Sequence, residues 1–169
     1  FLVGHGCAAA GQMGTASMSV PYASASSGMK ARDEITKMLQ RFGCESVGFM
    51  AEFGEHCVVL AFRHRGRPVQ LKASARGWAA MFLREHPYSH RMRASKAEHE
   101  AAALKQGYIA INSILRDCVK GQITAVECGM LSFEGVFMPY MLTNDGRPLV
   151  ERLAGLEMLP APTGGKDGK

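Results

Sequence analysis

The sequence predicts a single α+β domain: an N-terminal helix, a three-stranded antiparallel meander, then a short helix, one long helix and C-terminal short helices. Three observations support this. Apolar residues recur at helical spacing before residue 43, alternate with polar residues in three short runs between residues 47 and 73, and return to helical spacing after residue 75. A chain of 169 residues is long enough for one domain with a hydrophobic core and too short for two comfortable ones.

The two ends of the chain differ in composition from its middle. Residues 1–26 are rich in Gly, Ala and Ser and lack the basic and apolar regions of a signal peptide, and residues 160–169 are polar and rich in Pro and Gly. We therefore expect a disordered or non-native leader over 1–26, the domain over 27–159 and a disordered tail over 160–169. Because the chain begins with Phe, Met18 is a candidate translation start.

The first helix is expected over residues 29–42. Ser26 or Ser27 can cap its start, and Gly43 suits its C-terminal cap. Its apolar face is formed by Ile35, Met38, Leu39 and Phe42. This spacing is typical of an amphipathic helix that buries one side.

The three alternating runs predict a meander with a definite register. Their apolar residues are Val47, Phe49, Ala51 and Phe53, then Val58, Leu60 and Phe62, then Val69, Leu71 and Ala73. A turn at Gly54–Glu55 pairs Phe49 with Leu60, and a turn at Arg65–Gly66 pairs Leu60 with Leu71. All three apolar sets then lie on one face, an agreement that a slip of one residue would destroy. The other face mixes small, polar and basic residues, so we expect it to be partly open.

Helices are expected in the rest of the domain. A short one over residues 76–87 ends at Pro87, and a capping box of Ser95 and Glu98 opens a helix of up to about 25 residues that ends near Gly121. The apolar seam of this long helix is Ala101, Leu104, Tyr108, Ile111, Leu115 and Cys118. The seam can pack across the sheet or against a second copy, which would make a homodimer. Three short helices are expected over residues 122–129, 132–138 and 147–159.

Positive charge is concentrated in one segment. The whole chain has a formal net charge of +5, but residues 61–93 contain eight Lys and Arg residues against a single acid, Glu85. We predict a basic β-hairpin patch that binds nucleic acid, because the arginine guanidinium matches phosphate oxygens. The predicted primary contacts are Arg63, Arg65, Arg67 and Lys72, and the supporting contacts are Arg76, Arg91 and Arg93.

Two alternatives to this hypothesis stay open. The hairpin arginines can simply be a solvated turn that protects an edge strand, or the basic surface can dock on an acidic protein, which would make the chain an interaction or inhibitory module. Most aromatic residues fall on predicted core faces, which leaves Tyr22 and Tyr88 as the exposed candidates for base stacking. Contact with a duplex backbone, or binding to an acidic protein, therefore fits better than a stacking platform. Of the two nucleic acids, we expect DNA rather than RNA as the partner.

No catalytic, metal or cofactor site is predicted. Cys118 and Cys128 have no histidine in the same local pattern, there is no CxxC pair, and Pro87 keeps His86 and His90 off one helix face. Five cysteines without close pairs indicate a reducing compartment. No stretch reaches the ~20 apolar residues of a membrane span. We expect a non-enzymatic protein of the cytoplasm.

Two stretches carry a resemblance to a known group. "FRHRGRPVQL" and "AVECGMLSFEGVFMPYMLTNDGRPLVERL" resemble small uncharacterised proteins encoded in tailed bacteriophages and prophages of proteobacteria, over residues 29–153. The resemblance implies a bacterial host cytoplasm and a setting of phage DNA metabolism. It supplies no catalytic residues.

Overall fold

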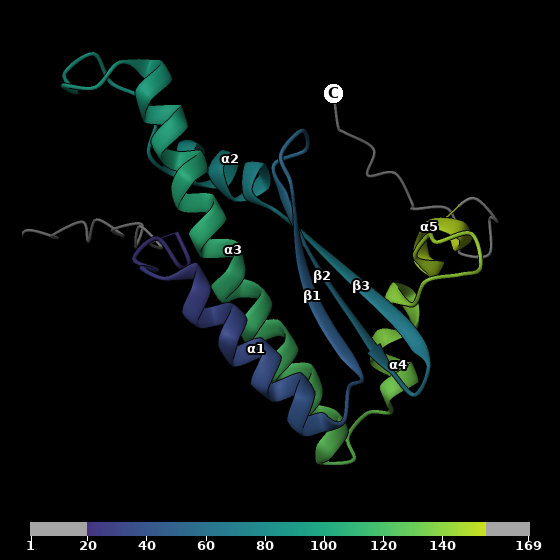
Figure 1. Ribbon diagram of the computed structural model, residues 1–169. Helices are drawn as coiled ribbons and strands as arrows, with labels where there is room; N and C mark the ends of the chain where they lie inside the picture. The colour runs from purple at the N-terminus through teal and green to yellow at the C-terminus, as the bar shows by residue number, and fades with distance from the viewer. Residues whose placement is uncertain (1–19, 155–169) are drawn as a thin grey trace, which may run out of the picture.

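The computed structural model describes residues 20–154 and confirms the α+β architecture (Figure 1). The helices α1 and α3 lie side by side against the sheet, α2 packs against the first half of α3, and α4 and α5 lie on the β3 side. The elements are α1 (Gly28–Phe42), β1 (Ser46–Glu52), β2 (Cys57–His64), β3 (Arg67–Ser74), α2 (Ala75–Glu85), α3 (Lys96–Glu127), α4 (Phe133–Phe137), the 3₁₀ turn η1 (Met138–Tyr140) and α5 (Leu149–Leu153).

The predicted meander register is confirmed at every pair. The strand order is β1-β2-β3, and Leu60 lies opposite Phe49 on one side and Leu71 on the other. The β2–β3 turn has positive φ at both Arg65 (49°) and Gly66 (74°), as in a type I′ hairpin turn. The β1–β2 connection is a four-residue loop, residues 53–56, rather than a two-residue turn, but it is centred on the same point and so preserves the register.

The two faces of the sheet differ as expected. The inner face buries Val58, Leu60, Phe62, Val69 and Leu71 against the apolar sides of α1, α3 and α4. The other face leaves Gly48, Met50, Arg63 and Lys72 exposed. The inner face is therefore covered by helices, whereas the other face is open at its margins but still buries Val59 of the central strand (2% exposed). Arg63 and Lys72 lie on this outer face, whereas Arg67 lies on the inner face beside Glu134 of α4.

Helix α1 also matches its prediction. The Ser27 side chain accepts a hydrogen bond from the Lys30 backbone N–H, and Gly43 ends the helix in the left-handed region with φ of 91°. Ile35 and Leu39 are fully buried, as their spacing indicates. These caps stabilise both ends of the helix that covers β1.

The long helix α3 differs from its prediction. It continues through Gly121 to Glu127 and absorbs the separate helix expected over residues 122–129. A glycine costs a helix only about 1 kcal/mol, and the burial of Val119 and Ile123 on either side outweighs that cost. With 32 residues α3 is roughly 47 Å long.

The predicted seam of α3 is only partly correct. Ile111 and Leu115 are buried within the chain, whereas Ala101 and Cys118 are exposed. Gly107 and Ala110, which the predicted seam omitted, are also buried, and Gly107 allows the close approach of α3 to Ala75 of α2. Ile111 and Leu115, at the centre of the seam, are therefore part of the chain's own core.

The predicted domain boundary at residue 27 is too late. Val20 is 4% exposed, and the indole N–H of Trp78 donates to the Pro21 carbonyl at 3.0 Å. The Gln106 amide donates to the carbonyls of Ala23 and Ala25 at 3.1 and 2.8 Å. Composition missed this attachment because it depends on contacts with residues distant in sequence, several of them to backbone carbonyls, which any residue carries. The rest of the predicted leader, residues 1–19 with Met18, and the residues after 154, including the tail, lie outside the described residues.

The C-terminal region contains shorter helices than expected. The helix predicted over residues 132–138 appears as α4 followed by η1, with Pro139 at the transition, and the helix predicted over 147–159 is described as α5. After η1 the chain adds to the sheet: the Leu142 N–H donates to the Pro68 carbonyl at 2.9 Å, and Met141 bridges Val69. This contact covers the outer edge of β3 near its start.

One buried polar group yields a stability prediction. His64 is 7% exposed between the rings of Phe42 and Phe133, at centroid distances of 4.8 and 4.5 Å, and its Nδ1 has no hydrogen-bond partner in the described part of the chain. We expect His64→Phe to raise the free energy of unfolding by about 1 kcal/mol, because it replaces an unsatisfied nitrogen with carbon.

Urea denaturation measures this change. The control is His90→Phe, at an exposed position, which we expect to change the free energy of unfolding by less than about 0.5 kcal/mol. A clear loss of stability in His64→Phe would show that the imidazole nitrogen is in fact satisfied.

Candidate functional site

The seven predicted contact residues lie in three separate places. Arg63, Arg65 and Arg67 lie at the β2–β3 hairpin tip, and the other end of β2 is roughly 24 Å away. Lys72 and Arg76 flank the β3–α2 junction, and Arg91 and Arg93 lie in the loop that precedes α3. That loop adjoins the N-terminal end of α3, whereas the hairpin tip lies near its C-terminal end (Figure 1). The structure therefore does not join the seven into one patch.

The hairpin tip combines free and paired arginines. The Arg67 guanidinium forms an ion pair with Glu134 of α4 at 3.2 Å, and the Gly66 backbone N–H donates to the Glu45 carboxylate at 2.8 Å. Arg63 and Arg65 are exposed and form no ion pair with an acid among the described residues. Two of the three tip arginines are thus exposed and have no acidic partner in the described part of the chain.

Lys72 is held between two acids. Its ammonium lies 2.8 Å from a carboxylate oxygen of Glu52 and 2.5 Å from one of Glu55. The hydrogen bonds to Glu52 and Glu55 raise the pKa of Lys72 well above its ordinary value, and the hydrogen bond from Lys72 lowers the pKa of Glu55. At neutral pH this cluster carries one positive and two negative charges, so Lys72 is poorly suited to bind a phosphate.

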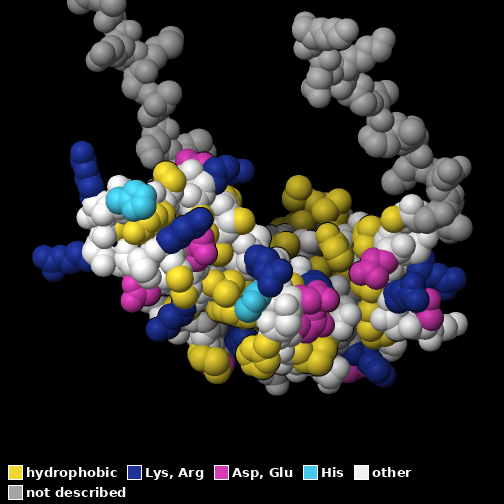
Figure 2. All heavy atoms as spheres, turned by 90° about the horizontal axis from the view of Figure 1, so that it is seen from above, with side chains coloured by type: hydrophobic (Ala, Val, Ile, Leu, Met, Phe, Trp, Pro, Cys, Tyr) yellow, Lys and Arg dark blue, Asp and Glu magenta, His cyan; other side chains and the backbone are white. Residues whose placement is uncertain are grey.

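The remaining predicted contacts are exposed. Arg76, Arg91 and Arg93 form no ion pair with an acid among residues 20–154. The loop before α3 also contains Tyr88, whose half-buried ring lies edge-on to the His90 ring with centroids 5.6 Å apart. Figure 2 shows Lys and Arg side chains spread over the visible face and interrupted by acidic and hydrophobic ones.

The exposed aromatic rings in the structure are not the two, Tyr22 and Tyr88, that the sequence analysis expected to be exposed. The Tyr22 hydroxyl donates to Asp117 at 2.8 Å, a hydrogen bond that raises the pKa of Tyr22 and fixes its ring. Phe53, expected on the core face, is instead 77% exposed in the β1–β2 loop. The alternation that predicted its burial ends with β1 at Glu52.

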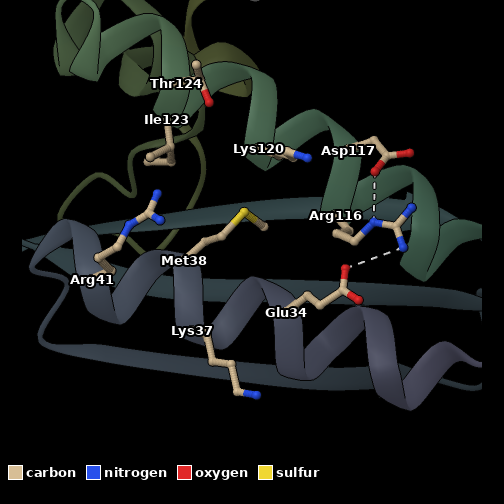
Figure 3. Close-up of a pocket in the computed structure, with 9 residues that line it drawn as sticks. All are labelled: Glu34, Lys37, Met38, Arg41, Arg116, Asp117, Lys120, Ile123 and Thr124. Carbon is tan, nitrogen blue, oxygen red and sulfur yellow. Dashed lines mark hydrogen bonds and ion pairs between the residues drawn. The ribbon is translucent and has the colours of Figure 1, made fainter.

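A groove between α1 and α3 is a feature that the sequence analysis did not predict (Figure 3). Its volume is about 410 Å³. Basic residues line both sides, Lys37 and Arg41 from α1 and Arg116 and Lys120 from α3. The two residues of each pair are four positions apart, which places them on the same side of their helix. This spacing is a sequence signal from which the basic lining of the groove could have been predicted.

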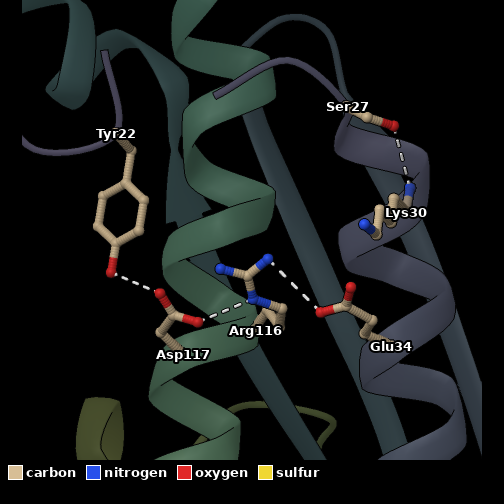
Figure 4. A network of polar contacts seen from close by, with 6 residues as sticks. All are labelled: Tyr22, Ser27, Lys30, Glu34, Arg116 and Asp117. Atoms are coloured by element: carbon tan, nitrogen blue, oxygen red, sulfur yellow. Dashed lines mark hydrogen bonds and ion pairs between the residues drawn. The ribbon is translucent and has the colours of Figure 1, made fainter. Parts of the chain in front are cut away.

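Much of the charge in this groove is compensated. The Arg116 Nε–H donates to Asp117 at 2.8 Å, and a second guanidinium nitrogen lies 3.5 Å from Glu34 of α1 (Figure 4). The hydrogen bond from Arg116 is the main cause of the lowered pKa of Asp117. Together with the bond from Tyr22, the network ties the N-terminal segment, α1 and α3 together, which is a structural role.

Cys44 and Cys118 are not activated as nucleophiles. Burial, followed by the nearby Glu45 charge, raises the pKa of the Cys44 thiol to about 11, and burial also raises the pKa of Cys118. Both thiols are protonated at neutral pH, whereas a nucleophilic cysteine requires a lowered pKa. Residues 20–154 contain no group of three or more His, Cys, Asp or Glu side chains placed to hold a metal ion.

The comparisons with known proteins identify no relative of this chain. No protein-family model, no curated protein and no solved structure matches the chain. Within residues 20–154, no helix combines the length and the apolar character needed to cross a membrane. Functional inference therefore depends on the side chains and distances described above.

Proposed function

We propose that this chain is a non-enzymatic nucleic-acid-binding protein that contacts phosphates through arginines at separate points along its length. One observation carries the proposal. Five of the seven predicted contacts are exposed and have no acidic partner among residues 20–154, namely Arg63, Arg65, Arg76, Arg91 and Arg93. A free guanidinium fork is the group that best matches a phosphate.

The spacing of these arginines favours a polymer over a small ligand. The hairpin tip and the loop before α3 lie near opposite ends of α3, a helix roughly 47 Å long, which corresponds to about 14 base pairs of duplex. A mononucleotide reaches only one of these places. A duplex that follows the molecule can reach more than one, so we propose a duplex as the ligand. The phage DNA metabolism that the resemblance implies favours DNA rather than RNA.

The resemblance to phage and prophage proteins supplies the proposed setting. A phage or prophage accessory protein acts in the cytoplasm of the bacterial host, where DNA is abundant and thiols are reduced. The free cysteines Cys44, Cys57, Cys118 and Cys128 are compatible with that compartment.

The hairpin can be tested with a double variant that preserves its backbone. Arg63→Gln with Arg65→Asn removes both charges, and asparagine tolerates the left-handed conformation that residue 65 requires. If both arginines contact phosphates, the slope of log K against log salt should become less negative by about 1.8, with weaker binding at low salt. Fluorescence anisotropy with a labelled duplex longer than about 14 base pairs measures both quantities.

A matched control separates specific contacts from net charge. Arg84→Gln with Arg152→Gln also removes two positive charges, but these arginines are paired with Glu85 and Asp145. We expect this variant to keep almost the full salt slope. No duplex binding at low salt by the unmodified chain, or an equal loss in both variants, would refute the proposal.

A second candidate function is docking on an acidic host or phage protein. The observation that favours it is the exposure of two large apolar side chains, Phe53 (77%) and Met50 (52%), because protein interfaces combine arginine with aromatic residues and methionine. Capture experiments from phage-infected cells, with and without nuclease, distinguish the two. Partners that persist after nuclease treatment and are lost in the Arg63/Arg65 variant support protein docking, whereas complete release by nuclease supports nucleic acid.

A further inference from the structure

The two edges of the sheet are protected very differently. The outer strand β3 carries Arg67, Pro68 and Lys72, and the Leu142 N–H covers part of its edge. Charged residues, proline and a covering segment are the usual devices that stop an edge strand from pairing with another chain. On that side, the fold already prevents association.

Strand β1, at the opposite edge, has almost none of these devices. Its sequence SVGFMAE contains no proline, lysine or arginine, and its single charge, Glu52, lies at the end and is held by Lys72. Among the described residues, only β2 pairs with it. The strand is seven residues long, roughly 20 Å, so it offers a long and regular row of unpaired backbone groups.

The side chains of β1 are also incompletely covered. Val47 and Phe49, on the core face, are only half-buried, and Met50 on the open face is 52% exposed. Gly48 has open space where a side chain would be. Apolar groups therefore border the free edge on both faces of the sheet.

We propose that β1 pairs antiparallel with β1 of a second copy of this chain, which joins two three-stranded sheets into one of six strands. A two-fold axis at Phe49 places that residue opposite itself in the partner copy. It also places Met50 opposite Gly48, Val47 opposite Ala51 and Glu52 opposite Ser46. Met50 and Val47 thus meet smaller residues, the two Phe49 rings pair with each other, and no two like charges of β1 lie directly opposite each other.

This self-complementarity is what favours a second copy over another partner. β1 itself contains no basic residue for an acidic peptide, and the nearby Arg32 of α1 is already placed over the Phe49 ring, 5.3 Å from its centroid. A basic peptide would find only Glu52, which already forms an ion pair with Lys72. The dimer differs from the one predicted through α3, whose central seam residues are buried in the chain's own core. It also does not depend on nucleic-acid binding.

The test is the oligomeric state of the full chain, measured by sedimentation equilibrium over a range of concentrations. The disrupting variant is Met50→Lys, since the axis at Phe49 would bring the two lysines to roughly 7–8 Å from each other. We expect it to weaken the dimer at least about tenfold. Met50 is half-exposed on the outer face of the sheet, opposite Val59 of β2, and lysine keeps an aliphatic stem at that position.

The matched control is Met29→Lys, which introduces the same charge at another exposed methionine, on α1 and 66% exposed. It should leave the dimer unchanged. A reversible dimer that Met50→Lys breaks and Met29→Lys keeps supports the proposal, as does concentration-dependent protection of β1 amides from hydrogen exchange. A monomer at all concentrations, higher aggregates, or a dimer insensitive to Met50→Lys would overturn it.

Discussion

Replacing Phe137 with alanine is expected to lower the free energy of unfolding by about 3–5 kcal/mol. Phe137 is fully buried, and its ring meets Phe62 of β2 edge-on at 5.4 Å and Phe133 at 4.9 Å. The helix that carries it has only five residues and cannot be stable by itself. The loss would be a large part of the 5–15 kcal/mol that typically stabilises a domain.

Urea denaturation monitored by circular dichroism measures this loss. The matched control is Phe53→Ala, because Phe53 is 77% exposed and we expect a change of less than about 0.5 kcal/mol. A small effect in Phe137→Ala would mean that α4 is not an integral part of the core. It would also weaken the case that α4 positions Glu134 against Arg67 at the hairpin tip.

The meander was predictable because two independent signals agree in it. Alternating apolar residues assign a face to each strand, and the turn residues fix how the strands pair. Only one register satisfies both, so the pairing of Leu60 with Phe49 and Leu71 followed from the sequence alone. The sequence signal for the capping box of Ser95 and Glu98 is equally local, and the structure contains this capping box as predicted.

The extent of α3 and the attachment of residues 20–26 were not predictable in this way. Both depend on tertiary contacts: the burial of Ile123 carries α3 beyond Gly121, and Trp78 and Gln106 bond to carbonyls of the N-terminal segment. Propensity and composition describe a segment by itself. They contain no information about which distant side chain will donate to its backbone.

The prediction of the candidate site was limited for a related reason. The excess of basic residues over residues 61–93 is a property of the chain order, whereas a patch is a property of the surface. In space, Arg91 and Arg93 lie near the N-terminal end of the 32-residue helix α3, whereas Arg65 lies near its C-terminal end. Arg67 and Lys72 form ion pairs with acids that are distant in sequence. Glu134 in particular lies 67 positions from Arg67, beyond any local pattern.

The substitution Gly107→Ala is expected to destabilise the protein although alanine favours helices. By helix propensity alone, the change would stabilise α3 by up to about 1 kcal/mol. An added Cβ, however, would lie 2.6 Å from the Ala75 carbonyl oxygen, a backbone atom that cannot rotate away. Overpacking of this kind costs about 1–3 kcal/mol, so we expect a net loss of stability.

The same helix contains the matched control. Gly121→Ala places its Cβ in open space, with nothing within 4 Å, so the helix-propensity gain of up to about 1 kcal/mol should appear undiminished. Opposite signs for two identical substitutions, measured by thermal and urea denaturation, would show that the contact of Gly107 with Ala75 fixes α2 against α3. That contact in turn sets where the loop with Arg91 and Arg93 begins. If both variants gain stability, α2 and α3 are not in close contact at Gly107, and the position of that loop relative to the hairpin is not fixed by this junction.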